Sequence, residues 1–188
     1  MSALSAGRGF LALTTMTTSL NACTIALRYA HSRKQFETTD KTDEIPIIQY
    51  PLTQIRLIPQ IATNIVQIPA GTELALIYGT DSSLFTDDKY LNEMHAISAA
   101  VKSRFSWSTL KAAQECRSIL GGHGYSVFAR IPSIVDDIDV NVTWEGDNTM
   151  LLQQTSKYLM KVIPNKIQTK VLNLSFIYDQ KNIDFDAL

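Results

Sequence analysis

Glycine, cysteine and histidine are all scarce in this sequence. Its 188 residues include 8 glycines, 2 cysteines and 3 histidines. With so few glycines, the segments between chain breakers are long, and they carry helical rather than alternating periodicity. The two cysteines, Cys23 and Cys116, have no metal-ligand spacing, and each lies in an apolar helical pattern. This context predicts two buried, reduced thiols rather than a disulfide.

The sequence also lacks a dominant charge and a long apolar run. A formal net charge of −1 gives no global electrostatic reason to bind nucleic acid or an anionic membrane. No uninterrupted apolar run approaches the roughly 18 residues of a membrane span. Arg8 interrupts the apolar N-terminal segment, so a signal peptide is not predicted either. The last three residues are not a peroxisomal address of the Ser-Lys-Leu type, and no targeting signal is readable.

The hydrophobic pattern predicts four long helices, over residues 4–36, 47–78, 87–120 and 146–162. Pro59 and Pro69 fall inside the second of them, where they are expected to bend or split it, and residues 123–141 are expected to form an irregular crossing. Four long helices with polar connections predict an all-α fold, an up-down four-helix bundle. The bundle is assigned to residues 1–164. Residues 165–188 are assigned to a C-terminal extension that starts a further, truncated region.

Two motifs flank the irregular crossing. The first, Gly121-Gly122-His123-Gly124, closes the third helix, and its bare backbone would let an extended ligand lie against the main chain. The second places one acid, Glu145, at the start of the fourth helix, where a carboxylate can serve as a base. Each motif also has a plainer explanation. A double glycine ends a helix, and an acid in a first helical turn interacts favourably with the helix dipole.

Taken together, GGHGYS (121–126) and TWEGDNT (143–149) resemble the C-terminal helical domain of the flavin-dependent acyl-CoA oxidases, relatives of the acyl-CoA dehydrogenases. The resemblance covers roughly residues 3–163. It implies FAD as cofactor, a homodimer and a peroxisomal location. It also implies a reaction of fatty acid β-oxidation, in which a fatty acyl-CoA is desaturated to trans-2-enoyl-CoA and molecular oxygen is reduced to hydrogen peroxide.

The resemblance assigns roles to ten residues. Glu145 would be the catalytic base for the α-proton of the substrate, and its backbone N–H would help to hold the thioester oxygen. Arg8 and Gly146 would approach the substrate. Contacts with the cofactor would come from Arg33, Gln35, Phe36, Gly121, Gly122, Asp147 and Thr149. In the dehydrogenases a glutamine that contacts the flavin of the neighbouring subunit stands where this chain has Ser118, so that contact is not predicted here.

Several of these residues have structural alternatives. A cation at a helix C-terminus, such as Arg33, is favourable for the helix dipole, and Arg8 could be an exposed helix residue. Asp147 and Thr149 could be ordinary residues of a helix N-terminus.

The acyl-CoA oxidases also possess a β-domain that covers one face of the flavin, and this sequence has no strand-rich segment to form it. The chain is therefore expected to be the base-bearing segment of an acyl-CoA oxidase, with little or no turnover by itself. One alternative is a catalytically silent helical bundle that serves as an oligomerisation or interaction module. Another is an acyl-CoA dehydrogenase that passes electrons to a partner protein. The motifs favour the oxidase because the dehydrogenases usually read GGxGF and YEGT.

Overall fold

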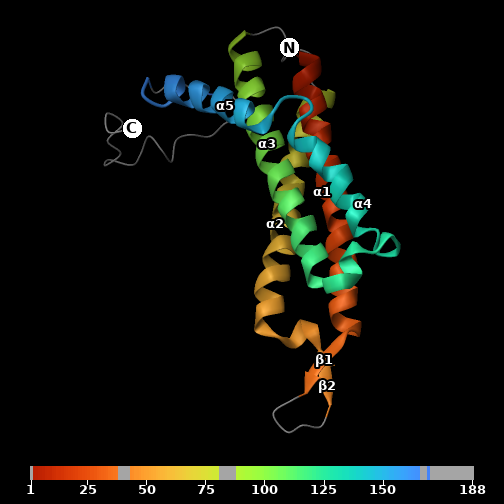
Figure 1. Cartoon of the computed structure of the whole chain (residues 1–188). Helices are drawn as coiled ribbons and strands as arrows, with labels where there is room; N and C mark the ends of the chain where they lie inside the picture. Colours follow the sequence, from red (N-terminus) through yellow and green to blue (C-terminus); the bar gives the residue numbers. More distant parts are fainter. Residues whose placement is uncertain (1, 38–42, 81–87, 166–168, 170–188) are drawn as a thin grey trace.

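The structure is a computed structural model that describes residues 2–37, 43–80, 88–165 and 169. Its helices are α1 (Ser2–Ser32), α2 (Pro51–Thr80), α3 (Asp88–Ile119), α4 (Ile131–Asp139) and α5 (Asn148–Val162). Helices α1, α2 and α3 run side by side as a long rod, α4 lies along its side, and α5 leaves the rod near one end (Figure 1). The predicted all-helical fold is confirmed.

The core between α1 and α3 is built largely from small side chains. Ala22, Ala26 and Ala30 repeat every four residues along α1 and pack in one cluster with Ala113 and Cys116 of α3. Residues four apart share one face of a helix. This repeat therefore gives α1 a face of small side chains, the alanine seam, on which α3 can pack closely.

The two thiols lie inside this seam. Cys23 and Cys116 are free and buried, with their Sγ atoms 3.8 Å apart. The hydrogen bond to Cys23, together with burial, raises the pKa of Cys116 above its ordinary value. The predicted pair of buried, reduced thiols is confirmed.

Helix α1 is long and apolar enough to cross a membrane. The sequence did not reveal this as an uninterrupted apolar run, because polar residues are spread along the helix. Residues Ser5–Ser32 reach a mean hydropathy of 1.4 over the 18-residue window. Within the described residues, however, α1 supplies the centre of the protein core: Ala12, Met16, Ala22 and Ala26 are fully buried. A core helix that is packed on several faces has the same composition as a membrane span.

The first helix ends earlier than predicted. Residues Lys34–Glu37 form strand β1, which pairs antiparallel with β2 (Glu44–Pro46) in a two-stranded hairpin at the far end of the rod (Figure 1). The prediction that helix continues to Phe36 is therefore wrong. Phe36 adopts a left-handed φ of 63°, a conformation that a helix does not allow.

Two further connections differ from expectation. Helix α2 continues unbroken through Pro59 and Pro69, so the prolines do not split it. The expected irregular crossing contains α4, in which Ile131, Ile134 and Ile138 are buried. Most of the predicted C-terminal extension lies outside the described residues.

Candidate active site

The turn before α5 has an unusual backbone at its acidic residue. This turn follows the short 3-10 helix η5 (Val140–Val142) and places Glu145 at φ 56° and Gly146 at φ 113°. A left-handed φ costs a residue with a side chain about 1–2 kcal/mol. Such strain persists only where the surroundings hold it, and it concentrates at functional sites.

The strained backbone aims the Glu145 carboxylate at α1. A Cβ atom built on Gly7 would lie 3.2 Å from Oε1 of Glu145 and 3.4 Å from Oε2. Within the described residues, Oε2 is buried and has no hydrogen-bond partner. Gly7 therefore leaves room for a carboxylate whose Oε2 accepts no hydrogen bond from the described residues, and a general base accepts a proton on such a free lone pair.

Arg8 holds the main chain of this turn from α1. Its side chain is 6 % exposed, and its Nε donates to the carbonyl oxygen of Glu145 at 2.9 Å. Burial lowers the pKa of Arg8, and the charge of Glu145 partly offsets this effect. The exposed position considered from sequence is thus wrong for Arg8.

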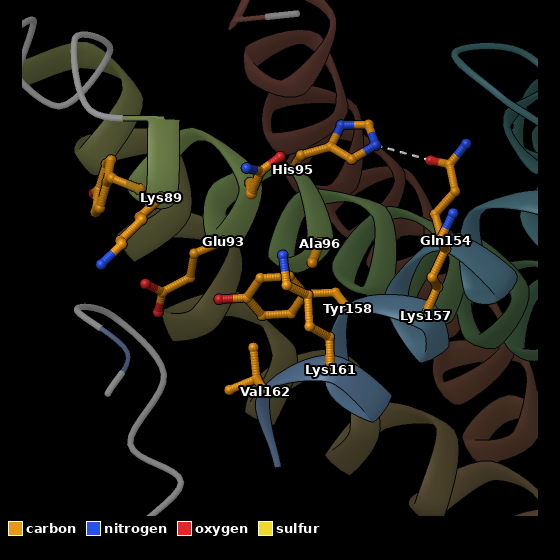
Figure 2. Close-up of a pocket in the computed structure, with 11 residues that line it drawn as sticks. Lys89, Glu93, His95, Ala96, Gln154, Lys157, Tyr158, Lys161 and Val162 are labelled. Carbon is orange, nitrogen blue, oxygen red and sulfur yellow. Dashed lines mark hydrogen bonds between the residues drawn. The ribbon is translucent and has the colours of Figure 1, made fainter. Parts of the chain in front are cut away.

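His95 extends this network to α5. Its Nδ1 lies 3.3 Å from Nη1 of Arg8, and its Nε2 lies 2.9 Å from Oε1 of Gln154. An arginine can only donate, so Nδ1 accepts and Nε2 carries the proton. The bond between His95 and Gln154 lies at one edge of a pocket between α3 and α5 (Figure 2). Glu93, Tyr158 and several lysines also line this pocket.

Lys102 approaches the same turn from α3 and was not expected from sequence. Its Nζ donates to the carbonyl oxygen of Gly146 at 2.6 Å and to Oδ1 of Asn148 at 2.8 Å. The side chain is fully buried. The pKa of Lys102 is lowered to about 8, chiefly by burial and also by the charge of Arg8, while the charges of Asp147 and Glu145 act in the opposite direction.

This shift predicts that raising the pH from about 8 to about 10 stabilises the wild-type chain relative to Lys102→Met. An unfolded lysine titrates near 10.4, so between these values the unfolded chain binds more protons than the folded one. The free energy of unfolding then gains up to about 1.4 kcal/mol per pH unit. Urea titrations of both proteins at several pH values would measure the difference. A difference that stays constant above about pH 8 would contradict the assignment.

The glycine motif borders a separate hollow at the other end of α1. Arg33, Gln35, Gly121 and Gly122 line it together with Tyr29 and other residues. Gly121 has a φ of 58°, and in the part of the chain that the structure describes no atom lies within 4 Å of a Cβ added to Gly122. Four residues predicted to contact the cofactor are therefore brought together, beside a backbone without side chains.

The remaining predicted cofactor residues lie apart from this hollow. Phe36 is 67 % exposed and packs edge-on against Tyr50. Asp147 caps α5, because its Oδ1 accepts from the backbone N–H groups of Thr149 and Met150. Thr149 lines a shallow apolar groove with Trp107. For Asp147 the structure thus realises the helix-cap alternative, and its contact with a cofactor stays a prediction.

Within one chain the hollow and the base are far apart. Arg8 lies on α1 and contacts the Glu145 turn, whereas Arg33 borders the hollow one residue beyond the end of α1, 25 positions further along the chain. At 1.5 Å per residue this separation is about 38 Å. The predicted residues therefore form two sites in one protomer.

Comparison with known proteins matches the chain to one family. The model of the acyl-CoA oxidase C-alpha1 domain covers residues 1–160. Human peroxisomal acyl-coenzyme A oxidase 3 is 34 % identical over an alignment 192 residues long, which covers 98 % of this chain and 27 % of the relative. Peroxisomal acyl-coenzyme A oxidase 2 of Arabidopsis thaliana is 34 % identical over 178 residues, 95 % of this chain and 25 % of the relative.

Solved structures show the same likeness. Acyl-CoA oxidase 1 of Yarrowia lipolytica matches with a TM-score of 0.85 and 30 % identity, over 96 % of this chain and 29 % of that one. Acyl-CoA oxidase-2 of Caenorhabditis elegans, solved with FAD, ascaroside-CoA and ATP, gives a TM-score of 0.87 at 26 % identity, over 96 % of this chain and 28 % of that one. The chain spans about a quarter of the length of these relatives. It belongs to the acyl-CoA oxidase family, in which it corresponds to the C-alpha1 domain.

Proposed function

We propose that this chain is the part of a peroxisomal acyl-CoA oxidase that carries the catalytic base. Glu145 takes the α-proton of a fatty acyl-CoA on its carboxylate, and the substrate becomes trans-2-enoyl-CoA as its β-hydrogen leaves as hydride. The observation that carries the proposal is the buried Oε2 of Glu145 beside Gly7, which has no hydrogen-bond partner among the described residues. A carboxylate in this state can accept a proton without first breaking a hydrogen bond.

The residues of the hollow fit FAD. Arg33 supplies a guanidinium suited to pyrophosphate oxygens, and Gly121 and Gly122 leave the backbone bare for an extended ligand. We assign these residues, with Gln35 and Phe36, to cofactor binding. When bound, FAD would supply the acceptor for the hydride, and molecular oxygen would take the electrons to give hydrogen peroxide.

The distance between hollow and base supports a homodimer. A cofactor held at the hollow lies about 38 Å along α1 from the base of its own protomer. In a dimer with antiparallel rods, the hollow of one protomer would face the base of its partner. Arg8 and Gly146 would border the substrate at that base.

A catalytically silent interaction module is the second candidate. Several large aliphatic side chains of α2 are more than half exposed, among them Leu52, Ile55, Ile65 and Val66. Exposed apolar patches of this kind mark protein contacts. The same side chains would be covered by the other domains of a complete oxidase. Their exposure here therefore favours the silent module only if the assembled enzyme also has no activity.

Flavin titration and a peroxide assay separate the two candidates. The purified chain is titrated with FAD, then supplied with a fatty acyl-CoA under air. We expect a folded helical chain with little or no peroxide, because the walls that enclose a ligand are shared with the rest of the enzyme. A chimera of Yarrowia lipolytica acyl-CoA oxidase 1, with its matching segment replaced by residues 1–160, is expected to bind FAD and form peroxide. A folded chimera that binds FAD without turnover would favour the silent module.

A further inference from the structure

The Glu145 turn is held by groups from both neighbouring helices. Its backbone is left-handed at Glu145 and has a positive φ at Gly146. If the turn relaxed to an ordinary backbone, the Glu145 side chain would leave its place above Gly7. The direction of the carboxylate therefore depends on whatever fixes the main chain on either side of it.

Two cations fix consecutive carbonyl groups of this turn. Arg8 of α1 donates to the carbonyl oxygen of Glu145, and Lys102 of α3 donates to that of Gly146. Each bond involves a charged donor, which makes it stronger than a bond between neutral groups. If these carbonyl groups turned away, each cation would lose one of its hydrogen-bond acceptors inside the protein.

Lys102 also fixes the start of α5. The Oδ1 atom of Asn148 accepts from Lys102, while its Nδ2 donates to Oγ of Ser106 at 2.9 Å and to the carbonyl oxygen of Ser103 at 3.3 Å. Asn148 is 1 % exposed. Lys102 thus binds oxygen atoms on both sides of Asp147, one from Gly146 and one from Asn148, and links the turn to the start of α5.

We propose that Lys102 is a positioning residue, which with Arg8 clamps the Glu145–Gly146 turn and aims the Glu145 carboxylate at the substrate. Stability alone does not account for a buried lysine, because an apolar side chain of similar size is often at least as stabilising at such a place. The proposal rests on the proposed function of Glu145 as base. It adds Lys102 to the residues that serve the reaction, as one that acts through the Glu145 turn and does not touch the substrate.

Lys102→Met in the full chain tests the clamp, because methionine keeps an unbranched side chain and removes the ammonium. Amide hydrogen exchange by NMR is the first readout. We expect the amides of Thr149, Met150 and Leu151 to exchange at least tenfold faster than in the wild type, with displaced resonances at Glu145 and Gly146. The amides of Ala22 and Ala26 in the core are expected to keep their rates. Lys111→Met, an exposed lysine on the same helix, is the matched control and is expected to change none of these rates.

Two outcomes would overturn the proposal. One is an unchanged turn in Lys102→Met. The other is faster exchange at Ala22 and Ala26 to the same degree as at the turn, since a merely structural lysine would lower stability throughout. If Lys102→Met does not fold, Asn148→Ser, which removes one acceptor of the ammonium, is expected to give the same local pattern with a smaller increase.

Turnover supplies a second, separate readout. In the chimera of the previous section, Lys102→Met is expected to lower kcat by about 10–100-fold with KM for acyl-CoA within twofold, because the base is misaligned while the substrate still binds. Faster exchange at the turn with unchanged kcat would refute the role in aiming the base. A chimera inactive even with Lys102 intact would count against the proposed function, and the exchange data would still decide the clamp.

Discussion

Glu145→Gln is expected to lower kcat for peroxide formation by about 10²–10⁴-fold in the chimera that carries residues 1–160. Glutamine has nearly the same size as glutamate but cannot accept the α-proton. The turn should keep its shape, because Arg8 and Lys102 hold main-chain carbonyl groups that the substitution leaves in place. Steady-state rates under air, with the peroxide coupled to a dye, give kcat and KM separately.

Glu115→Gln is the matched control for this loss. Glu115 forms an ion pair with Arg56 at 2.8 Å, and both side chains are about a third exposed. A pair of this kind contributes about 0–1 kcal/mol to stability. Arg56 lies on α2, and Glu115 lies on α3 in the half of the helix beyond Lys102. We expect kcat within twofold of the unsubstituted chimera. If Glu145→Gln also kept more than about a tenth of the original kcat, another group would have to be the base.

Gly124→Ala is expected to destabilise the chain by about 3 kcal/mol. Gly124 is buried in the 3-10 helix η3 (Gly121–Tyr125) that follows α3. A Cβ at this position would run into the carbonyl oxygen of Arg117. That oxygen belongs to the backbone of the last turn of α3, so relief requires η3 to move as a unit. Urea unfolding followed by circular dichroism measures the loss.

Gly122→Ala, two residues earlier, is the control because a Cβ at Gly122 meets no atom within 4 Å. We expect a change within about 0.5 kcal/mol. Equal losses from both substitutions would mean that backbone freedom, rather than the contact with Arg117, requires glycine in this motif. Gly122→Ala has a second use: a weaker FAD affinity with unchanged stability would support the cofactor role of the hollow.

The sequence predicted the long helices well where local signals agreed. Helix α3 was expected over 87–120 and spans Asp88–Ile119, because its apolar period is regular and Gly121 ends it. Helix α5 was expected from 146 and begins at Asn148 behind its cap, Asp147. Caps and periodicity act within a few residues, so they are readable from the chain itself.

The errors arose where distant pairing decides the structure. Lys34 and Gln35 leave the helical path because they pair with Pro46 and Ile45 of β2, a contact that no local pattern predicts.

Helix α4 was missed for a different reason, because the acidic residues near its end resembled a loop. Its isoleucines at 131, 134 and 138 carried the helical period and could have revealed it.

The site was predicted in part. The glycine motif and Arg33 do meet in one hollow. Lys102 escaped notice because a lysine in an amphipathic helix usually marks the solvated face. Only the approach of the Gly146 and Asn148 oxygen atoms explains its burial. Arg8, by contrast, was named from the family resemblance, and it lies on α1 and contacts the Glu145 turn.

Helix α1 is unbroken, so the number of residues in it fixes the distance and the angle between Arg8 at the Glu145 turn and Arg33 at the hollow. Each residue in an α-helix turns the chain by about 100° and advances it by 1.5 Å. One residue inserted near Thr17 would therefore swing Gly7 and Arg8 to another side of the rod while Arg33 stayed in place. Between Arg8 and Arg33, the exchange of an exposed side chain leaves the two ends in register, whereas the gain or loss of a single position would turn one end relative to the other.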